Sequence, residues 1–138
     1  MENVTVSGSI TSTPDEAWDD NTPSYIGGIV GSNRGTVTSC DFQGYVVSAT
    51  VGGIAGANYG TITDCKKIIG VISNGGSNIQ ATGCIIGVIF PTNGNYSNVV
   101  VSGNTFRRNN TNEPQYGIGI DGRLPTPGPS NTGTTQIY

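Results

Sequence analysis

An acidic loop and a set of threonines are the two groups of residues whose types and spacing suit binding chemistry. The loop, PDEAWDD at residues 14–20, places four carboxylates around one tryptophan: Asp15, Glu16, Asp19, Asp20 and Trp18. Carboxylate oxygens at this density can bind calcium, but the spacing is not that of an EF-hand loop and its turn glycine is missing. We therefore favour a solvated loop anchored by Trp18, with calcium as the weaker alternative. Trp18 also has the shape to stack on a sugar ring or to contact a partner protein.

The second group is a hydroxyl pattern, Thr-x-Thr, that occurs twice with the same spacing. Its members are Thr36, Thr38, Thr61 and Thr63, with Thr5 and Ser7 as a weaker copy before them. A ladder of Thr-x-Thr on one sheet face can order water, so ice binding is a minor alternative. The pattern decays to Gln80/Thr82 and Val100/Ser102, and threonine is in any case favoured on exposed strands. We predict these four threonines to form a ligand- or partner-binding face.

Two aspartates and a few basic residues are the only candidates for enzymatic chemistry. Cleavage of a polysaccharide would need two positioned carboxylates, and Asp41 and Asp64 lie near equivalent positions, although their registers differ by two. Anionic sugars would require cations, for which the candidates are Lys66, Lys67, Arg107 and Arg108. We favour isolated surface charges, assign no catalytic residue, and predict a protein without enzymatic activity. The chain has no histidine and no CxxC pair, so no metal centre is predicted.

The candidate residues lie within or beside a repeated sequence motif, which determines where the fold places them. GGIVGSNRGTVTSC at residues 27–40 returns as GGIAGANYGTITDC at 52–65, which aligns Cys40 with Cys65. Weaker copies place Ser9, Cys84 and Asn104 in the same column, at spacings of 31, 25, 19 and 20 residues. One matching strand per period of this length is typical of a β-solenoid. Period-two alternation puts Val37, Ile62 and Val101 on the inner face, with Phe42, Ile86 and Phe106 in the wider part of the core. The three cysteines stand at a bend, where we favour buried thiols acting as small hydrophobes over one disulfide and a free thiol.

The fold predicted from this repeat is all-β: a single-stranded right-handed parallel β-helix of about five coils. It covers residues 1–123, is interrupted by the acidic loop at 11–24, and is followed by a Pro- and Gly-rich arm or linker at 124–138. The segment QYGIGIDGR (115–123) is expected to supply a last strand. The terminal TTQIY has a composition suited to joining a neighbour's sheet edge.

Residues 25–40 and 51–65, YIGGIVGSNRGTVTSC and VGGIAGANYGTITDC, resemble the GLUG repeat. That repeat occurs in bacterial and archaeal surface proteins, including adhesin-like proteins and regions beside the catalytic domain of some immunoglobulin A peptidases. The resemblance implies a right-handed β-helix with an architectural role, and it brings no catalytic residue to this chain. The segments on either side depart from the pattern.

Composition narrows the function classes. The chain has 138 residues, 22 of them glycine, with 11% charged residues and a net charge of −3. A nucleic-acid partner is not expected without a basic stripe, and no apolar run is long enough to span a bilayer. We expect a structural or adhesive module of a cell-surface or extracellular assembly, binding copies of itself, adjacent domains of a longer surface protein, or glycans. The alternative is a β-helix that binds or degrades polysaccharide.

Overall fold

The computed structural model describes residues 1–11, 25–48, 50–69, 72–73, 81–107, 117–121 and 136–137. These residues form strands, bridges and turns and include no helix, so no helix among them could cross a membrane. All pairings between strands are parallel. The predicted all-β class with parallel strands is therefore confirmed. Its basis is the abundance of β-branched residues and the scarcity of helix formers.

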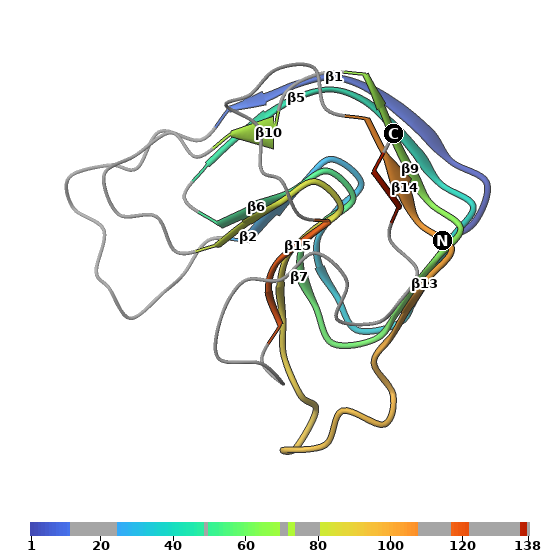
Figure 1. Ribbon diagram of the computed structural model, residues 1–138, viewed down its shortest axis with the longest axis vertical. Coiled ribbons are helices and arrows are strands. Elements are labelled where there is room, and N and C mark those ends of the chain that lie inside the picture. The colour runs from blue at the N-terminus through green and yellow to red at the C-terminus, as the bar shows by residue number, and fades with distance from the viewer. Residues whose placement is uncertain are drawn as a thin grey trace, which may run out of the picture.

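The strands form four parallel sheets, each named here by one of its inner strands (Figure 1). The β5 sheet contains β1 (Thr5–Thr11), β5 (Asp41–Val47), β9 (Lys66–Ile69), β14 (Thr105–Phe106) and β16 (Gln136–Ile137), with β10 (Ile72–Ser73) also on β5. The β6 sheet contains β2 (Tyr25–Gly27), β6 (Thr50–Gly52) and β11 (Ala81–Gly83). The β7 sheet contains β3 (Val30–Asn33), β7 (Ala55–Asn58), β12 (Ile86–Ile89) and β15 (Ile118–Asp121). The β8 sheet contains β4 (Thr36–Thr38), β8 (Thr61–Thr63) and β13 (Val100–Ser102).

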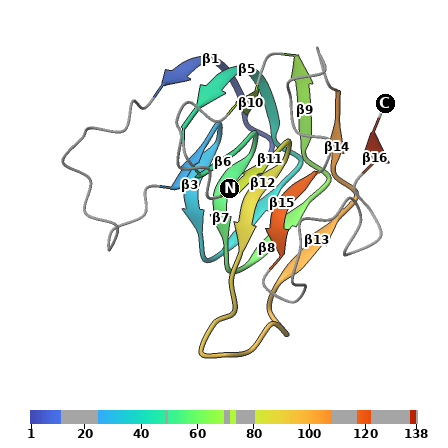
Figure 2. The same ribbon diagram turned by 60° about the vertical axis from the view of Figure 1, so that its left-hand side comes forward.

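The chain visits these sheets in a fixed order. It crosses the β6, β7, β8 and β5 sheets in turn, and we call each such crossing a passage. The first passage begins at β2, the second at β6 and the third at β11. In Figure 2 the strands of the β7 sheet stand side by side, one from each passage. The segment 115–123 supplies β15, as predicted. The end of the chain pairs with its own β14, through Thr105 opposite Gln136, and so occupies an edge of its own sheet.

The register confirms the 25-residue repeat and corrects two members of the predicted column. Thr36 lies opposite Thr61, and Ser102 lies opposite Thr63, which places Asn104 in the column of Cys40 and Cys65 as expected. Ser9 instead lies opposite Tyr45.

Cys84 also lies outside the predicted column, because Gly83 pairs with Gly52 and so belongs to the glycine-rich strand. The third passage returns to the β8 sheet only at Val100, 39 residues after Thr61. The repeat length varies because insertions sit at the corners between strands, where extra residues cost little loop entropy.

The repeated glycines make the corner between the β6 and β7 sheets. A Cβ atom added at Gly27, Gly52 or Gly83 would lie 2.2, 2.1 or 2.0 Å from the carbonyl oxygen three residues later. No real side chain tolerates such an approach, so the bend requires glycine. The core inside the sheets is apolar, and Phe42, Ile86 and Phe106 are buried in it as predicted.

Candidate functional site

The four predicted threonines come together on the outer face of the β8 sheet. Thr36 lies opposite Thr61 and Thr38 opposite Thr63, and the third strand adds Val100 and Ser102 in the same register. Thr36 and Val100 are exposed and the other four are half-buried. We call these six residues the hydroxyl face.

The inner side of the same strands fixes which way this face points. Val37, Ile62 and Val101 alternate with the hydroxyl residues and are 2%, 0% and 2% exposed. Because successive side chains in a strand point to opposite faces, burying this column turns the threonines outward. A shift of one residue would bury the hydroxyls, so the apolar column specifies the register.

The hydroxyls are partly organised among themselves. The Oγ1 atom of Thr63 donates a hydrogen bond to Oγ1 of Thr38 at 3.0 Å. The row that begins with Thr36 and Thr61 ends at the apolar Val100, so complete Thr-x-Thr rungs occur on β4 and β8 only among the described strands. Such a short ladder weakens the case for ice binding.

A corner of stacked asparagines, which we call the Asn corner, leads into the hydroxyl face. Asn33 and Asn58 are buried, and Nδ2 of Asn33 donates to Oδ1 of Asn58 at 2.8 Å. Each side chain also closes its own turn: Oδ1 accepts from the amide two residues on, at 3.1 Å for Asn33 and 3.2 Å for Asn58. In the same turns the Nδ2 groups donate to the oxygens of Gly35 and Gly60, at 3.2 and 2.9 Å. These bonds satisfy buried polar groups where ladder pairing is interrupted.

A second corner, the Cys corner, ends the hydroxyl face. Cys40 and Cys65 are fully buried, and each Sγ lies 3.2 Å from a strand carbonyl oxygen, that of Thr38 or Thr63. Burial raises the pKa of the Cys65 thiol to about 11, so it is a neutral thiol near pH 7. The residues before the two cysteines, Ser39 and Asp64, have φ of 52° and 55°, the left-handed conformation that makes the turn.

Asn104 takes the cysteine position in the third passage. Its Oδ1 accepts from the amide of Cys65, and its Nδ2 donates to the oxygen of Ile62, both at 2.9 Å. The two corners therefore hold β4 and β8 at both ends, and the Cys corner also holds the end of β13. This arrangement makes the hydroxyl face a short, firmly anchored surface.

The charged candidates do not assemble into one site. Asp41 lies opposite Lys66 in the β5 sheet, whereas Asp64 sits in the turn of the Cys corner, so the two carboxylates belong to different columns. Lys67 was predicted among the surface cations, and this is wrong. It is 1% exposed, and its Nζ donates to the carbonyl oxygen of Arg107 at 2.5 Å. Strand alternation turns it inward beside the exposed Lys66.

The acidic loop lies outside the described residues, and with it Trp18, Asp15, Asp19 and Asp20. Their roles as a binding loop or calcium site stay predictions, as does the contribution of Arg108. In the ranges that the structure does describe, no three histidine, cysteine, aspartate or glutamate residues are grouped as metal ligands.

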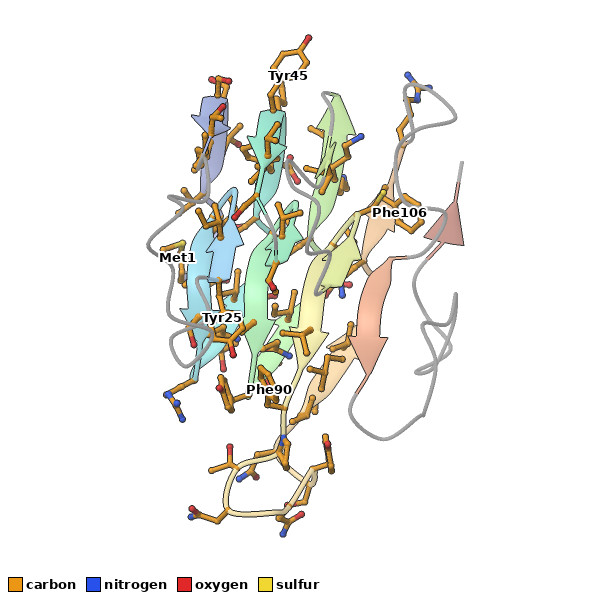
Figure 3. The ribbon with its side chains drawn as sticks, turned by 90° about the vertical axis from the view of Figure 1, so that its left-hand side faces the viewer. Met1, Tyr25, Tyr45, Phe90 and Phe106 are labelled. Carbon is orange, nitrogen blue, oxygen red and sulfur yellow. The ribbon has the colours of Figure 1, made fainter. Side chains whose placement is uncertain are left out.

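An aromatic column that the sequence patterns did not reveal runs across the end of the β7 sheet. Cζ of Arg34 lies 4.1 Å from the ring centroid of Tyr59, and Tyr59 stacks on Phe90 with centroids 5.2 Å apart. Tyr25 meets Phe90 edge-on at 5.7 Å, and Figure 3 shows these two rings together. The three strands are in register at their last residues, and the next residue of each is Arg34, Tyr59 or Phe90. A sequence alignment that placed Phe90 in this position would therefore have predicted the column.

The aromatic column is a packing feature more than a platform for a ligand. Both faces of Tyr59 are occupied, one by the guanidinium group and one by Phe90. Burial raises the pKa of the Tyr25 phenol, with the nearby Tyr59 adding to the effect. Directly after Phe90 the chain forms a tight hairpin with a bridge between Thr92 and Asn95, visible at the bottom of Figure 3.

No family model matches the chain, and neither a curated protein nor a solved structure does. The resemblance to the GLUG repeat remains a prediction that depends on residues 25–40 and 51–65.

Proposed function

We propose that the chain is a right-handed parallel β-helix that acts as a non-enzymatic structural or adhesive module of a cell-surface or extracellular assembly. One observation carries the adhesive part: the hydroxyl face presents Thr36, Thr61 and their neighbours in register, on strands anchored at both corners. A glycan is the class of ligand that suits such a face, because its own hydroxyls pair with uncharged donors and acceptors.

The β-helix part of the proposal is supported by the strand order. Four sheets are visited in the same order in successive passages, and equivalent strands pair in parallel. Parallel strands are about 4.8 Å apart, so each passage adds one such step along the stack. Parallel crossover connections are right-handed in nearly all proteins, which supports the proposed hand.

The rigidity of the face favours binding. β-Branched threonines have few side-chain rotamers to lose, and the Thr38–Thr63 hydrogen bond already fixes one pair. A ligand that contacts a preorganised surface sacrifices less conformational entropy on binding.

A glycan array followed by affinity measurements would test this proposal. In Thr36→Val/Thr61→Val the shape of the face is kept and two hydroxyls are lost, so affinity for a captured glycan should fall about thirtyfold, at roughly 1 kcal/mol for each of two hydrogen bonds. The control is Thr105→Val, which makes the same change on the β5 sheet. Equal affinities for the two variants, or a wild type that captures no glycan, would contradict the adhesive role.

The same captured glycan tests the enzymatic alternative. Incubation should release no new reducing ends. Chain cleavage that disappears in Asp41→Asn or Asp64→Asn would establish a polysaccharide-degrading enzyme instead.

A further inference from the structure

The first strand, β1, presents an edge at which the core is incompletely covered. In the described part of the chain it is the end strand of the β5 sheet, paired on one side with β5. The apolar side chains near this edge are half-buried, and they all pack on the core: Val4, Val6, Ile10, Ile26, Ile29 and Val30. The opposite end differs, because Phe106 and Ile118 are each 1% exposed. One end of the stack therefore has apolar surface left to cover.

The sequence of β1 is nearly the same in both directions. It reads Thr-Val-Ser-Gly-Ser-Ile-Thr from Thr5 to Thr11, and it is symmetric about Gly8. Its exposure is symmetric too: Val6 and Ile10 are half-buried and the other five residues are exposed. In an antiparallel pair of such strands, Val6 lies opposite Ile10 of the other copy and Ser7 lies opposite Ser9.

The free edge of β1 has the backbone groups that such pairing needs. The oxygen of Val4 accepts from the amide of Asp41 at 2.9 Å, so the backbone groups of Val4 point toward β5. Because these groups alternate along a strand, those of Thr5 and Ser7 point to the free edge. At the centre of symmetry, a Cβ added to Gly8 would meet no other atom within 4 Å.

From these observations we infer that two copies of the chain dimerise by antiparallel pairing of β1 about a two-fold axis at Gly8. The β5 sheets become one continuous sheet, and the two half-covered ends of the core face each other. The contact uses the same surface on both copies, so it closes on itself and stops at a dimer. An exposed strand edge is thereby converted into an interface. The inference deepens the proposed assembly role and depends on the folded scaffold proposed there.

Two charge variants of the 138-residue chain test both the interface and its register. In Ser7→Lys/Ser9→Lys, the pairing places two lysines opposite each other twice per dimer. In Ser7→Lys/Ser9→Glu, every lysine faces a glutamate. Sedimentation velocity over a range of protein concentrations should show a dimer for the wild type. The dissociation constant should rise about tenfold for the lysine pair and stay within about threefold for the mixed pair, since cross-strand charge pairs act in opposite directions.

The two variants should have the same effect on the stability of the monomer, so a difference between them reports on the interface. Ser7 and Ser9 are exposed, and their neighbours on β5 are the uncharged Gln43 and Tyr45. Circular dichroism and thermal unfolding at low concentration should therefore agree for the two proteins. A wild type that is monomeric at every concentration, a larger open-ended assembly, or equal dissociation of the two variants would overturn the inference.

These outcomes separate the inference from the proposed function. A monomer whose hydroxyl face still captures a glycan would overturn the dimer alone. A dimer with no glycan binding would overturn the adhesive role alone.

Discussion

The Asn corner and the Cys corner lie at opposite ends of β4 and β8 and use different chemistry. In the Asn corner, Asn33 and Asn58 satisfy the turns with directional hydrogen bonds between side chains and backbone. In the Cys corner, Cys40 and Cys65 fill the bend with small buried thiols, and the backbone itself takes up positive φ just before them.

In the third passage an apolar residue takes the asparagine position and an asparagine takes the cysteine position. Ile89 lies opposite Asn58, and Asn104 follows Cys65 in the other corner. Where isoleucine replaces asparagine the tight turn is lost, and the chain makes the Thr92–Asn95 hairpin before it reaches β13. Asparagine therefore occurs in the Asn corner only where the turn is tight, while the Cys corner holds either a buried thiol or an asparagine whose amide is fully hydrogen-bonded.

The largest effect should follow loss of the buried asparagine, in Asn58→Ala. Its amide makes three hydrogen bonds, to Asn33 and to both backbone groups of Gly60, and all three would be lost. The Gly60 amide would be left without its partner in the interior, whereas Asn33 Nδ2 would keep its bond to the Gly35 oxygen and the Gly60 oxygen would still accept from the amide of Val100. We expect the free energy of unfolding to fall by about 3 kcal/mol, measured by urea denaturation. Asn33→Ala, in the outermost tight turn, is the matched comparison and should cost less. A loss below about 1 kcal/mol for Asn58→Ala would mean that the turns need no directional bonds.

A smaller loss is expected for Asn104→Ala in the Cys corner. Two hydrogen bonds disappear, those with the amide of Cys65 and the oxygen of Ile62, and the expected cost is about 2 kcal/mol. Asn104→Cys sharpens the comparison, because it makes the third passage a copy of the first two. If cysteine restores full stability, the corner requires only volume; if it restores none, the polar bonds matter there as well.

Removing one thiol should have a modest effect. Cys65→Ala leaves a small void in a corner that keeps its backbone geometry, so we expect a loss of about 1 kcal/mol in the same urea titration. A loss as large as that of Asn58→Ala would remove the distinction between the corners.

The smallest effect near neutral pH is that of thiol ionisation. Burial raises the pKa of Cys65 to about 11 from an ordinary value of 9.0, so its contribution to stability is complete below pH 9 and is lost between pH 9 and 11. Unfolding titrations at pH 8 and pH 10 should show this decrease in the wild type and less of it in Cys65→Ala. An identical decrease in both proteins would assign it to other groups.

The sequence predicts the fold best where the repeat length is constant. The joint position of the four threonines follows from the 25-residue spacing. The burial of Phe42 and Phe106 follows from their shared place two residues after Cys40 and Asn104, and the all-β class follows from the β-branched composition. The positions of Ser9 and Cys84 do not follow from the spacing, because insertions at the corners change the spacing without disturbing any strand.

The burial of Lys67 agrees with strand alternation, since it lies opposite Phe42 and Phe106, but its residue type indicates a surface position. A lysine looks the same in sequence whether its amine reaches solvent or a carbonyl group inside the protein. The aromatic column does not follow from alternation, because its members lie directly after the strand ends, where side chains no longer alternate between two faces.

The glycines that enter each passage carry a consequence for how the chain avoids misassembly. A Cβ at Gly28 would lie 2.4 Å from the Phe42 ring, whereas one at Gly53 would lie 3.1 Å from the Lys67 stem. Cys84 occupies the next position in this series. The first two passages thus pair different large side chains with the glycine gaps, and the third has a cysteine side chain in place of the gap. A strand that docked one passage too early during folding would meet the wrong side chain. Near-identical repeats are therefore still distinguished by their packing partners. Misfolded states with the strands out of order, which are common kinetic traps of repetitive chains, become less stable than the native order.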